Sequence, residues 1–585
     1  MKHNTAKHTR REEERRRRRR RRELTAQFYR GNHFLFFVCV IFSLLMGGLN
    51  LVLSWMIQQL IDTISGSPNA LHLPALSLLT VLVILLVVVF KTLDYFSKPR
   101  FFEKAMCQYK DYAFQKLTPK SIASFQDETT AAYLSAFSND TASIETNLLE
   151  QQFTLVANGV MFFGALFMML FYSPLLTAIA IVLSVLPFLA SMTAGRRMEE
   201  AETLVSDKNA SFVASLKDSL SGFSVIKSFR AEQAICSLFS KHNHDAENAK
   251  CHRRKLASLI GMIGSVAAIT AQMGVFLSGT WMALSGDRIT AGVVLLFVNL
   301  MNFIIDPIAQ MPSMLANRRA ALSLVDKLAA ALHTHIRDQG DSIPNRLEDG
   351  ITLEDVSFGY EPNTLVLHHL SLRFEAQKSY AIVGTSGSGK STLLNLLMAA
   401  HDDYTGTIRY DSHSLSQISS ESLYDLVSVI QQNVFLFNAS IRDNITMFRP
   451  FPKEDVDRVI QLSGLAPLIA QKGEDYLCGE NGCGLSDGER QRISIARSLL
   501  RRCCVLLADE ATASLDKETA NHVANAILDL DGLTRIVVTH ALDASQLRRY
   551  DCILTMKNGR LEEMGNFDTL MEQKGYFYSL YTVSA

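Results

Sequence analysis

The stretch Gly384-Thr385-Ser386-Gly387-Ser388-Gly389-Lys390-Ser391 fits the pattern G-x-x-x-x-G-K-[ST] of a phosphate-binding loop. The preceding Ser379–Val383 is apolar, as in a buried strand, and the following Thr392–Met398 has the pattern of a helix. In this context the glycines let backbone N–H groups surround a phosphate, and the helix N-terminus adds a favourable dipole. We therefore expect a nucleoside triphosphate here, with Lys390 on its β- and γ-phosphates and Ser391 on Mg²⁺.

Charge is distributed unevenly along the 585 residues, although the formal net charge is zero. Residues 1–22 contain twelve Lys or Arg and three Glu, a net of +9, and residues 15–22 are eight consecutive arginines. Such a run is typical of a disordered, solvated tail that fixes membrane orientation, and attraction to anionic lipid or RNA is the functional alternative. We predict a basic, disordered cytoplasmic tail over residues 1–30. Nine scattered cysteines show no metal-ligand spacing, and their odd number argues against a disulfide framework.

Several apolar runs in the first half approach the roughly 20 residues that a helix needs to cross a bilayer. A buried core helix could explain one short run but explains six of them poorly. The predicted spans are residues 34–57, 76–95, 153–172, 175–191, 259–284 and 291–308. Lys and Arg are abundant in the long segments 96–150 and 192–255. They are almost absent from the segments 58–75, 173–174 and 285–290. The positive-inside rule therefore places the N-terminus and both long segments in the cytoplasm.

The two long cytoplasmic segments mix charged and apolar residues at helical spacing. This pattern predicts helical extensions of the spans, with a short turn at each tip, near Asp127–Tyr133 and near Gly222-Phe223. Polar residues within the spans either line a pathway or hydrogen-bond between helices. They are Asn158, Gln272, Asn299, Asn302 and Asp306.

The pattern changes in the second half of the chain. Residues 313–345 lose the apolar density and are predicted to form a linker, and from Ile351 strands alternate with helices, as in a parallel α/β domain. An apolar strand ends in Asp509 and Glu510. We expect Asp509 to lie near Mg²⁺ and Glu510 to polarise the attacking water. A second apolar strand ends in His540, which completes the elements of a phosphoryl-transfer site.

With these features, the chain resembles a half-transporter of the ATP-binding cassette (ABC) family with the exporter fold. The most specific motif is Leu485-Ser486-Asp487-Gly488-Glu489, which is similar to the family signature L-S-G-G-Q. A phosphate loop alone would leave GTPases and kinases open. The resemblance covers nearly all of the chain after residue 30. It implies a membrane α-helical domain with six spans over residues 31–312, the linker 313–345, and an α/β P-loop ABC ATPase domain over residues 346–585.

The resemblance also implies individual roles, with ATP and Mg²⁺ as cofactors. Tyr360 matches the aromatic residue that stacks on adenine, Gln432 the glutamine that contacts Mg²⁺ and senses the membrane domain, and His540 the switch histidine. Asp516 matches the loop that crosses the dimer interface, and the loop tips match the coupling helices. The implied catalytic residues are Glu510, His540 and Gln432. The implied ATP-binding residues are Tyr360, Gly384, Thr385, Ser386, Gly387, Ser388, Gly389, Lys390, Ser391, Thr392, Ser486, Gly488 and Asp516, and the implied Mg²⁺ ligands are Ser391, Gln432 and Asp509.

The signature departs from the family consensus at Asp487 and Glu489. In the family, the Ser hydroxyl and the second Gly N–H of one subunit's signature contact the γ-phosphate held by the other subunit, and Ser486 and Gly488 are retained. Asp487 would place a carboxylate near that phosphate and should repel it. Because Glu510 is intact, this pattern favours one half of a heterodimer with one strong and one degenerate site. A homodimer in which Asp487 points to solvent is the alternative.

The resemblance implies ATP-driven export of an amphipathic small molecule, lipid or peptide by alternating access, with a second half-transporter subunit and membrane lipid as partners. An importer of a siderophore-like compound, or an ATP-gated channel or regulator, is the alternative. Six spans argue against a soluble ABC ATPase, so no nucleic acid partner is expected. We expect a multi-pass protein of the bacterial inner membrane, with the N-terminus and the ATPase domain in the cytoplasm.

Overall fold

The computed structural model describes residues 2–68, 70–126, 130–192, 195–285, 289–333, 340–361 and 364–584. The chain forms two compact units. The first comprises Met1–Phe114 and Thr130–Leu332, and the second comprises Gln115–Thr129 and His333–Ala585. The described part of the first unit is helical, and both sheets belong to the second.

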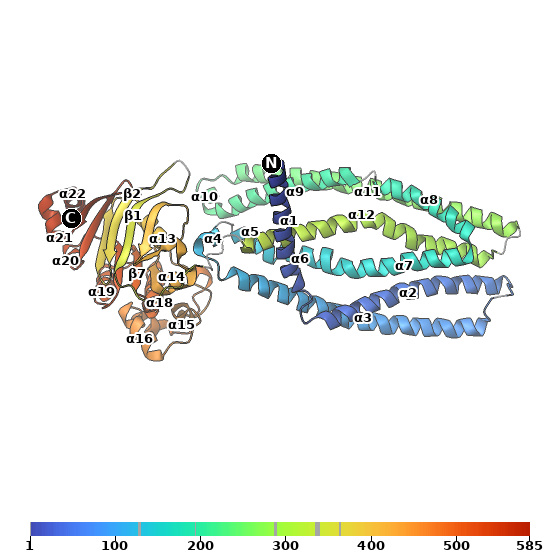
Figure 1. Ribbon diagram of the computed structural model, residues 1–585, viewed down its shortest axis with the longest axis horizontal. Helices are drawn as coiled ribbons and strands as arrows, with labels where there is room; N and C mark the ends of the chain where they lie inside the picture. The colour runs from blue at the N-terminus through green and yellow to red at the C-terminus, as the bar shows by residue number, and fades with distance from the viewer. Residues whose placement is uncertain are drawn as a thin grey trace. The chain divides into compact units, whose positions relative to one another are not determined.

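Long helices lie side by side in the first unit (Figure 1). Each predicted span falls within one of them: α2, α3, α7, α8, α11 and α12. Among the described residues, five helices are long and apolar enough to cross a membrane, and the apolar stretch Pro174–Leu186 of α8 is a shorter sixth. The helices are α1 Lys2–Ala26, α2 His33–Ile64, α3 Leu73–Leu117, α5 Thr130–Phe137, α6 Asn139–Ile144, the π-helical stretch Glu145–Glu150, α7 Gln151–Tyr172, α8 Pro174–Met192, α9 Gly195–Ser221, α10 Phe223–Ser228, α11 Glu232–Leu284 and α12 Ala291–His333.

The helical extensions predicted for residues 96–150 and 192–255 are confirmed. α3 continues to Leu117, α9 occupies much of the second long segment, and α11 begins at Glu232. The turn at Gly222 separates α9 from α10, as predicted. At the other tip, residues 127–129 lie outside the described residues, and the short helix α4 (Ile122–Gln126) precedes the predicted position.

The structure differs from the prediction of a disordered tail over residues 1–30, because residues 2–26 form the helix α1. Glu and Arg both have good intrinsic helix propensity. Tertiary contacts also hold the end of the segment: Phe28 is only 1% exposed and its ring stacks on Tyr109 of α3 at 4.9 Å. The charge count alone could not predict these apolar contacts, which begin at the buried Leu24.

The predicted linker 313–345 also begins too early, because α12 continues to His333. The chain becomes more polar beyond residue 312 but keeps apolar side chains at helical spacing, and Ala321, Val325 and Leu328 are buried. Residues 334–339 lie outside the described residues. The second unit is already packed at Asp341, whose N–H donates to Gln417 O.

The second unit contains a four-stranded antiparallel sheet in the order β2-β1-β4-β5 and a six-stranded sheet in the order β10-β9-β3-β8-β7-β6 (Figure 1). In the larger sheet only the edge pair β10–β9 is antiparallel. This parallel α/β domain confirms the predicted fold of the second half. The strands are β1 Gly350–Phe358, β2 Leu367–Glu375, β3 Ser379–Gly384, β4 Thr405–Tyr410, β5 His413–Ser414, β6 Val427–Ile430, β7 Val505–Asp509, β8 Thr534–Val538, β9 Cys552–Lys557 and β10 Arg560–Gly565.

Helices cover the sheets and form a small subdomain with its own apolar core, in which Leu436, Ile441, Val456 and Ile493 are buried. The helices of the second unit are α4, α13 Lys390–Leu397, α14 Ser420–Leu426, α15 Ile441–Thr446, α16 Lys453–Leu462, α17 Ala466–Lys472, α18 Asp487–Leu500, α19 Lys517–Leu528, α20 Ala544–Leu547, α21 Phe567–Gln573 and α22 Tyr576–Ser584, with 3₁₀ turns at Leu415–Gln417 and Glu480–Gly482. The short helix α4 packs here, since Ile122 contacts the main core and its N–H donates to Tyr424 OH at 3.0 Å.

Candidate nucleotide-binding site

The carboxyl ends of three parallel strands meet at one edge of the larger sheet. Ile382 of β3 pairs with Val538 of β8, and Asp509 of β7 pairs with the same Val538. The residues that follow these strands are therefore neighbours, which is where open α/β sheets bind ligands. This register brings the phosphate loop, the two acids and His540 to one place, as the sequence predicted.

The phosphate loop connects the fully buried β3 to α13, whose first residue is Lys390. Gly387 and Gly389 have φ of 77° and 97°, in the region that favours glycine, and a Cβ at Gly389 would lie 2.7 Å from the Leu367 side chain. Lys390 is 5% exposed, and its Nζ donates to Gly384 O and Thr385 O, both at 2.9 Å. Burial lowers the pKa of Lys390, and Glu510 and Asp509 act in the opposite direction. A buried ammonium beside open backbone N–H groups suits a phosphate.

Asp509 has the environment of a metal ligand. Burial raises the pKa of its carboxyl group, while a hydrogen bond with the Ser391 side chain lowers it. One oxygen, Oδ1, is buried without a hydrogen-bond partner among the described residues. Since Mg²⁺ prefers oxygen ligands, this carboxylate and the Ser391 hydroxyl fit the ion.

Glu510 lies at the centre of a short hydrogen-bonded chain. It accepts a hydrogen bond from Gln432 Nε2 at 2.9 Å through Oε2, and His540 Nε2 lies 2.9 Å from Oε1. Its backbone is in the left-handed region, with φ of 51°, a conformation that costs energy for a residue with a side chain. The three residues predicted to be catalytic are therefore in contact, and the carboxylate is fixed between two polar groups.

An aromatic group flanks the other end of the phosphate loop. Tyr360 is exposed, and its OH lies 3.2 Å from Thr392 Oγ1. The His401 ring stacks on Phe358 at 4.9 Å and meets Tyr360 edge-on at 5.4 Å. A cavity of about 590 Å³ is lined by these three rings and by residues of α4. The sequence analysis missed His401, since no local pattern marks a single histidine after β3 and α13; burial lowers its pKa and favours the neutral ring.

The signature forms a separate site on the domain surface. Ser486 caps α18: its Oγ accepts from Glu489 N at 3.3 Å, and the Glu489 carboxylate accepts from Ser486 N at 2.7 Å, a complete capping box. Asp487 pairs with Arg490, one helical turn along α18. This ion pair offsets the negative charge that was expected to repel phosphate, and the capping box leaves the Ser486 hydroxyl hydrogen free to donate.

The structure brings together only part of the predicted ATP site. Asp516 caps α19 by accepting from Thr519 N at 3.0 Å, and a Cβ at Gly488 would lie 3.0 Å from Ser514 O. Within the described part of the chain, no hydrogen bond of Ser486 or Asp516 reaches the phosphate loop. Gly384–Thr392, Asp509, Glu510, Gln432, His540 and Tyr360 form one site, and the signature with the loop at Asp516 forms another.

The family model for the ABC transporter transmembrane region matches residues 36–308, and a second family model, described as ABC transporter, matches residues 367–513. The β-(1→2)glucan export ATP-binding/permease protein NdvA of Rhizobium etli is 31% identical over 419 residues, which are 70% of this chain and 70% of that protein. The ATP-dependent lipid A-core flippase of Pectobacterium atrosepticum is 27% identical over 485 residues, or 82% of this chain and 83% of that protein. A bacterial Atm1-family ABC exporter with ATP bound has the same fold, with a TM-score of 0.81 at 24% identity over 95% of this chain and 98% of that one. The chain therefore belongs to the ABC transporter family and carries an exporter-type membrane domain and an ATP-binding, ATP-hydrolysing domain in one polypeptide.

Proposed function

We propose that this protein is one half of a dimeric exporter that uses ATP to move an amphipathic small molecule, lipid or peptide across a membrane. One observation carries the proposal: the phosphate loop with its acids and the signature are both present, but they form separate sites in one chain. A second ATPase domain placed face to face would complete each phosphate loop with the other subunit's Ser486 and Gly488. The exposed apolar side chains of α10, Phe223 and Val225, offer a surface through which the membrane domain could engage such a partner.

Each residue of the phosphate-loop site would have a separate role in binding or hydrolysing ATP. Lys390 and the loop N–H groups would hold the phosphates, Tyr360 would stack on the adenine ring, and Ser391, Gln432 and Asp509 would hold Mg²⁺. When bound, the ion would supply positive charge that offsets the negative charge of the phosphates. Glu510, fixed by Gln432 and His540, would accept the proton of the attacking water.

Closure of the two ATPase domains on ATP would favour one state of the membrane domain, and hydrolysis would release it. The helix α4 supports this coupling, because it packs on the ATPase core through Ile122 and Tyr424 and borders the cavity beside Tyr360. Displacement of Tyr360 by nucleotide would therefore change the surroundings of α4. This helix follows the span helix α3 in the chain.

Whether the partner subunit is a second copy of this chain or a different chain depends on the effect of Asp487 on the signature. Its carboxylate favours a heterodimer with one degenerate site, whereas its pairing with Arg490 would allow two copies of this chain to complete both sites. Particle mass and ATPase activity of the chain purified alone separate these cases. An active species of twice the chain mass indicates a homodimer, and an inactive or monomeric species indicates a missing second half.

The name of the lipid A-core flippase supports a lipid as the cargo, and the name of the glucan export protein supports export as the direction. The charge distribution supports a bacterial inner membrane with the N-terminus and ATPase domain in the cytoplasm. Flux of a fluorescent amphiphile into inverted vesicles tests the direction. ATP-driven uptake that is lost in Glu510→Gln supports export, ATP-driven loss from preloaded vesicles indicates import, and an ATP-gated ion current without amphiphile flux would indicate a channel.

A further inference from the structure

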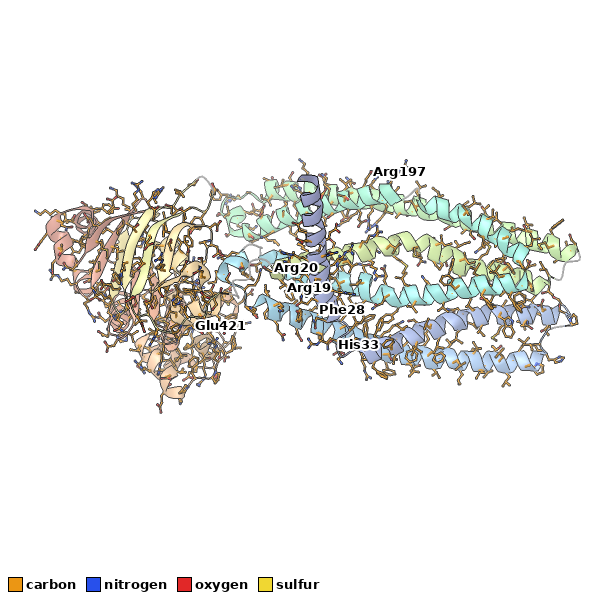
Figure 2. The ribbon with its side chains drawn as sticks, viewed as in Figure 1. Arg19, Arg20, Phe28, His33, Arg197 and Glu421 are labelled. Carbon is orange, nitrogen blue, oxygen red and sulfur yellow. The ribbon has the colours of Figure 1, made fainter. Side chains whose placement is uncertain are left out.

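The arginine-rich helix α1 crosses the long helices of the first unit instead of running alongside them (Figure 1). Its end is anchored by Leu24 and Phe28, and Asn32 Nδ2 donates to Phe101 O of α3 at 3.1 Å. Figure 2 labels Arg19 and Arg20 on this helix, with Phe28 and His33 following toward α2. The arginine run therefore has a defined place in the fold.

One face of α1 lies against α12. Arg17 Nε donates to Asp326 Oδ2 at 2.8 Å, and Arg21 Nε lies 3.1 Å from Oδ1 of the same carboxylate, which is 7% exposed. Arg17, Arg21 and Leu24 are four and three residues apart and so lie on one face of α1. The buried carboxylate of Asp326 thus fixes the rotation of α1 about its own axis.

A cavity of about 560 Å³ lies between these two helices. Glu13, Arg16, Arg17, Arg20, Asp326 and Lys327 line it, together with small residues of α12. The four cations and two carboxylates leave a net charge of +2 in the lining. Asp326 is already shared by Arg17 and Arg21, and no ion pair of Arg16, Arg20 or Lys327 is found among the described residues.

We propose that the cavity between α1 and α12 is a binding site for a phosphate-bearing anion, held by Arg16, Arg20 and Lys327. Arginine presents a planar fork of N–H donors that matches phosphate oxygens, and charge-assisted hydrogen bonds of this kind are the strong ones. The two arginines are one helical turn apart on α1, and Lys327 approaches from the other helix. An anion held by all three would tie α1 to the part of α12 that leads toward the ATPase domain.

The position along α12 bears on the source of the phosphate. Asp326 follows residue 308, the predicted end of the last span, by eighteen residues, or about 27 Å of helix. The head-group layer of a leaflet is only about 6 Å thick. A soluble phosphate compound or an extended phosphorylated head group therefore reaches the cavity more readily than the phosphate of an ordinary phospholipid.

The test is calorimetric titration of the full-length protein with sodium pyrophosphate in a neutral detergent and 150 mM salt. A Lys390→Ala background removes binding at the phosphate loop. The key variant is Arg16→Ala/Arg20→Ala, and the matched control is Arg18→Ala/Arg19→Ala, which removes the same charge from the same helix outside the cavity lining. We expect the key variant to weaken binding at least about tenfold and the control less than about threefold.

Equal weakening by both pairs, or no binding to the parent protein, would overturn the proposal. If a short RNA binds more tightly than pyrophosphate and both arginine pairs weaken its binding equally, the arginine run is a nucleic-acid surface and the cavity assignment is wrong. Nanodiscs with and without phosphatidylglycerol identify the source of the phosphate. If pyrophosphate binding that depends on Arg16 and Arg20 is lost only when the anionic lipid is present, a lipid phosphate occupies the site. If the binding is unchanged, the phosphate comes from a soluble compound. Circular dichroism and gel filtration of each variant show whether the fold is kept.

Discussion

The ion pair between Asp487 and Arg490 makes a quantitative prediction about the signature. The Asp487 side chain is 73% exposed and that of Arg490 31%, so the pair lies in a water-like environment, where such pairs contribute about 0.2–1 kcal/mol. In the proposed dimer, loss of the arginine would leave the carboxylate uncompensated beside the phosphate held by the other subunit. Since about 1.4 kcal/mol is a factor of ten, Arg490→Ala should weaken ATP-dependent activity roughly 1.5- to 5-fold.

A double-mutant cycle with Arg490→Ala, Asp487→Gly and the double variant isolates this charge effect from the other contacts of Arg490. One such contact is the hydrogen bond that its NH1 donates to Asn481 O at 3.2 Å. Asp487→Gly restores the consensus residue at this position and should change ATPase activity less than about twofold, because Arg490 already offsets the charge. Asp487→Gly/Arg490→Ala should recover most of the loss of Arg490→Ala. The assay is phosphate release against ATP concentration, with the dimer confirmed by mass. An increase of tenfold or more in Asp487→Gly alone would refute the reasoning, since Asp487 would then repel phosphate despite its partner.

Three further predictions test other parts of the structure. Glu510→Gln should lower phosphate release at least about a hundredfold while the protein still retains labelled ATP on a filter, because the amide cannot accept a proton; equal loss of retention would contradict the role. Phe28→Ala should lower the melting temperature and expose α1 to limited proteolysis, because it removes a 1% exposed ring that stacks on Tyr109, whereas Phe34→Ala, at an 80% exposed position, should do neither. Asp509→Asn should abolish Mg²⁺-dependent ATP hydrolysis yet raise thermal stability of the nucleotide-free protein at pH 7. Burial raises the pKa of Asp509, so ionisation of its carboxyl group destabilises the folded protein, and this destabilisation is complete at pH values above the raised pKa. The stability gained by Asp509→Asn should therefore vanish as the pH falls toward about 3.9, where the native carboxyl group is protonated.

Features encoded by local sequence could be predicted. A span needs only a long apolar run, and a phosphate loop needs only glycines, a lysine and a hydroxyl between a strand and a helix. Both therefore appear where expected, at α2 and at Gly384–Ser391. The adjacency of Asp509 and His540 also followed, since parallel strands end at one edge of their sheet.

Contacts between distant segments could not be predicted in the same way. Asp62, at the end of α2, is buried and accepts from Gly292 N at 3.1 Å at the start of α12, although it carried no signal in the sequence. The polar residues within the spans gave only a choice between a pathway and an interhelical bond. The structure favours the second for one pair, since Gln272 Nε2 donates to Asn302 Oδ1.

The errors at the two ends of the membrane domain have one physical origin. The arginine run led to the prediction of a disordered tail over residues 1–30, and the loss of apolar density led to the prediction of a linker over residues 313–345. Polarity excludes the bilayer but does not exclude a helix, and the two segments each carry an apolar face, with Leu24 on one and Val325 on the other. They also supply each other's charge partners, since Asp326 binds arginines of α1. Each segment alone is polar and ambiguous, and in the structure the carboxylate of one is buried against the guanidinium groups of the other. The same surplus of arginine over carboxylate that made the tail resemble a solvated segment is what leaves the cavity between α1 and α12 with positive charge for an anion.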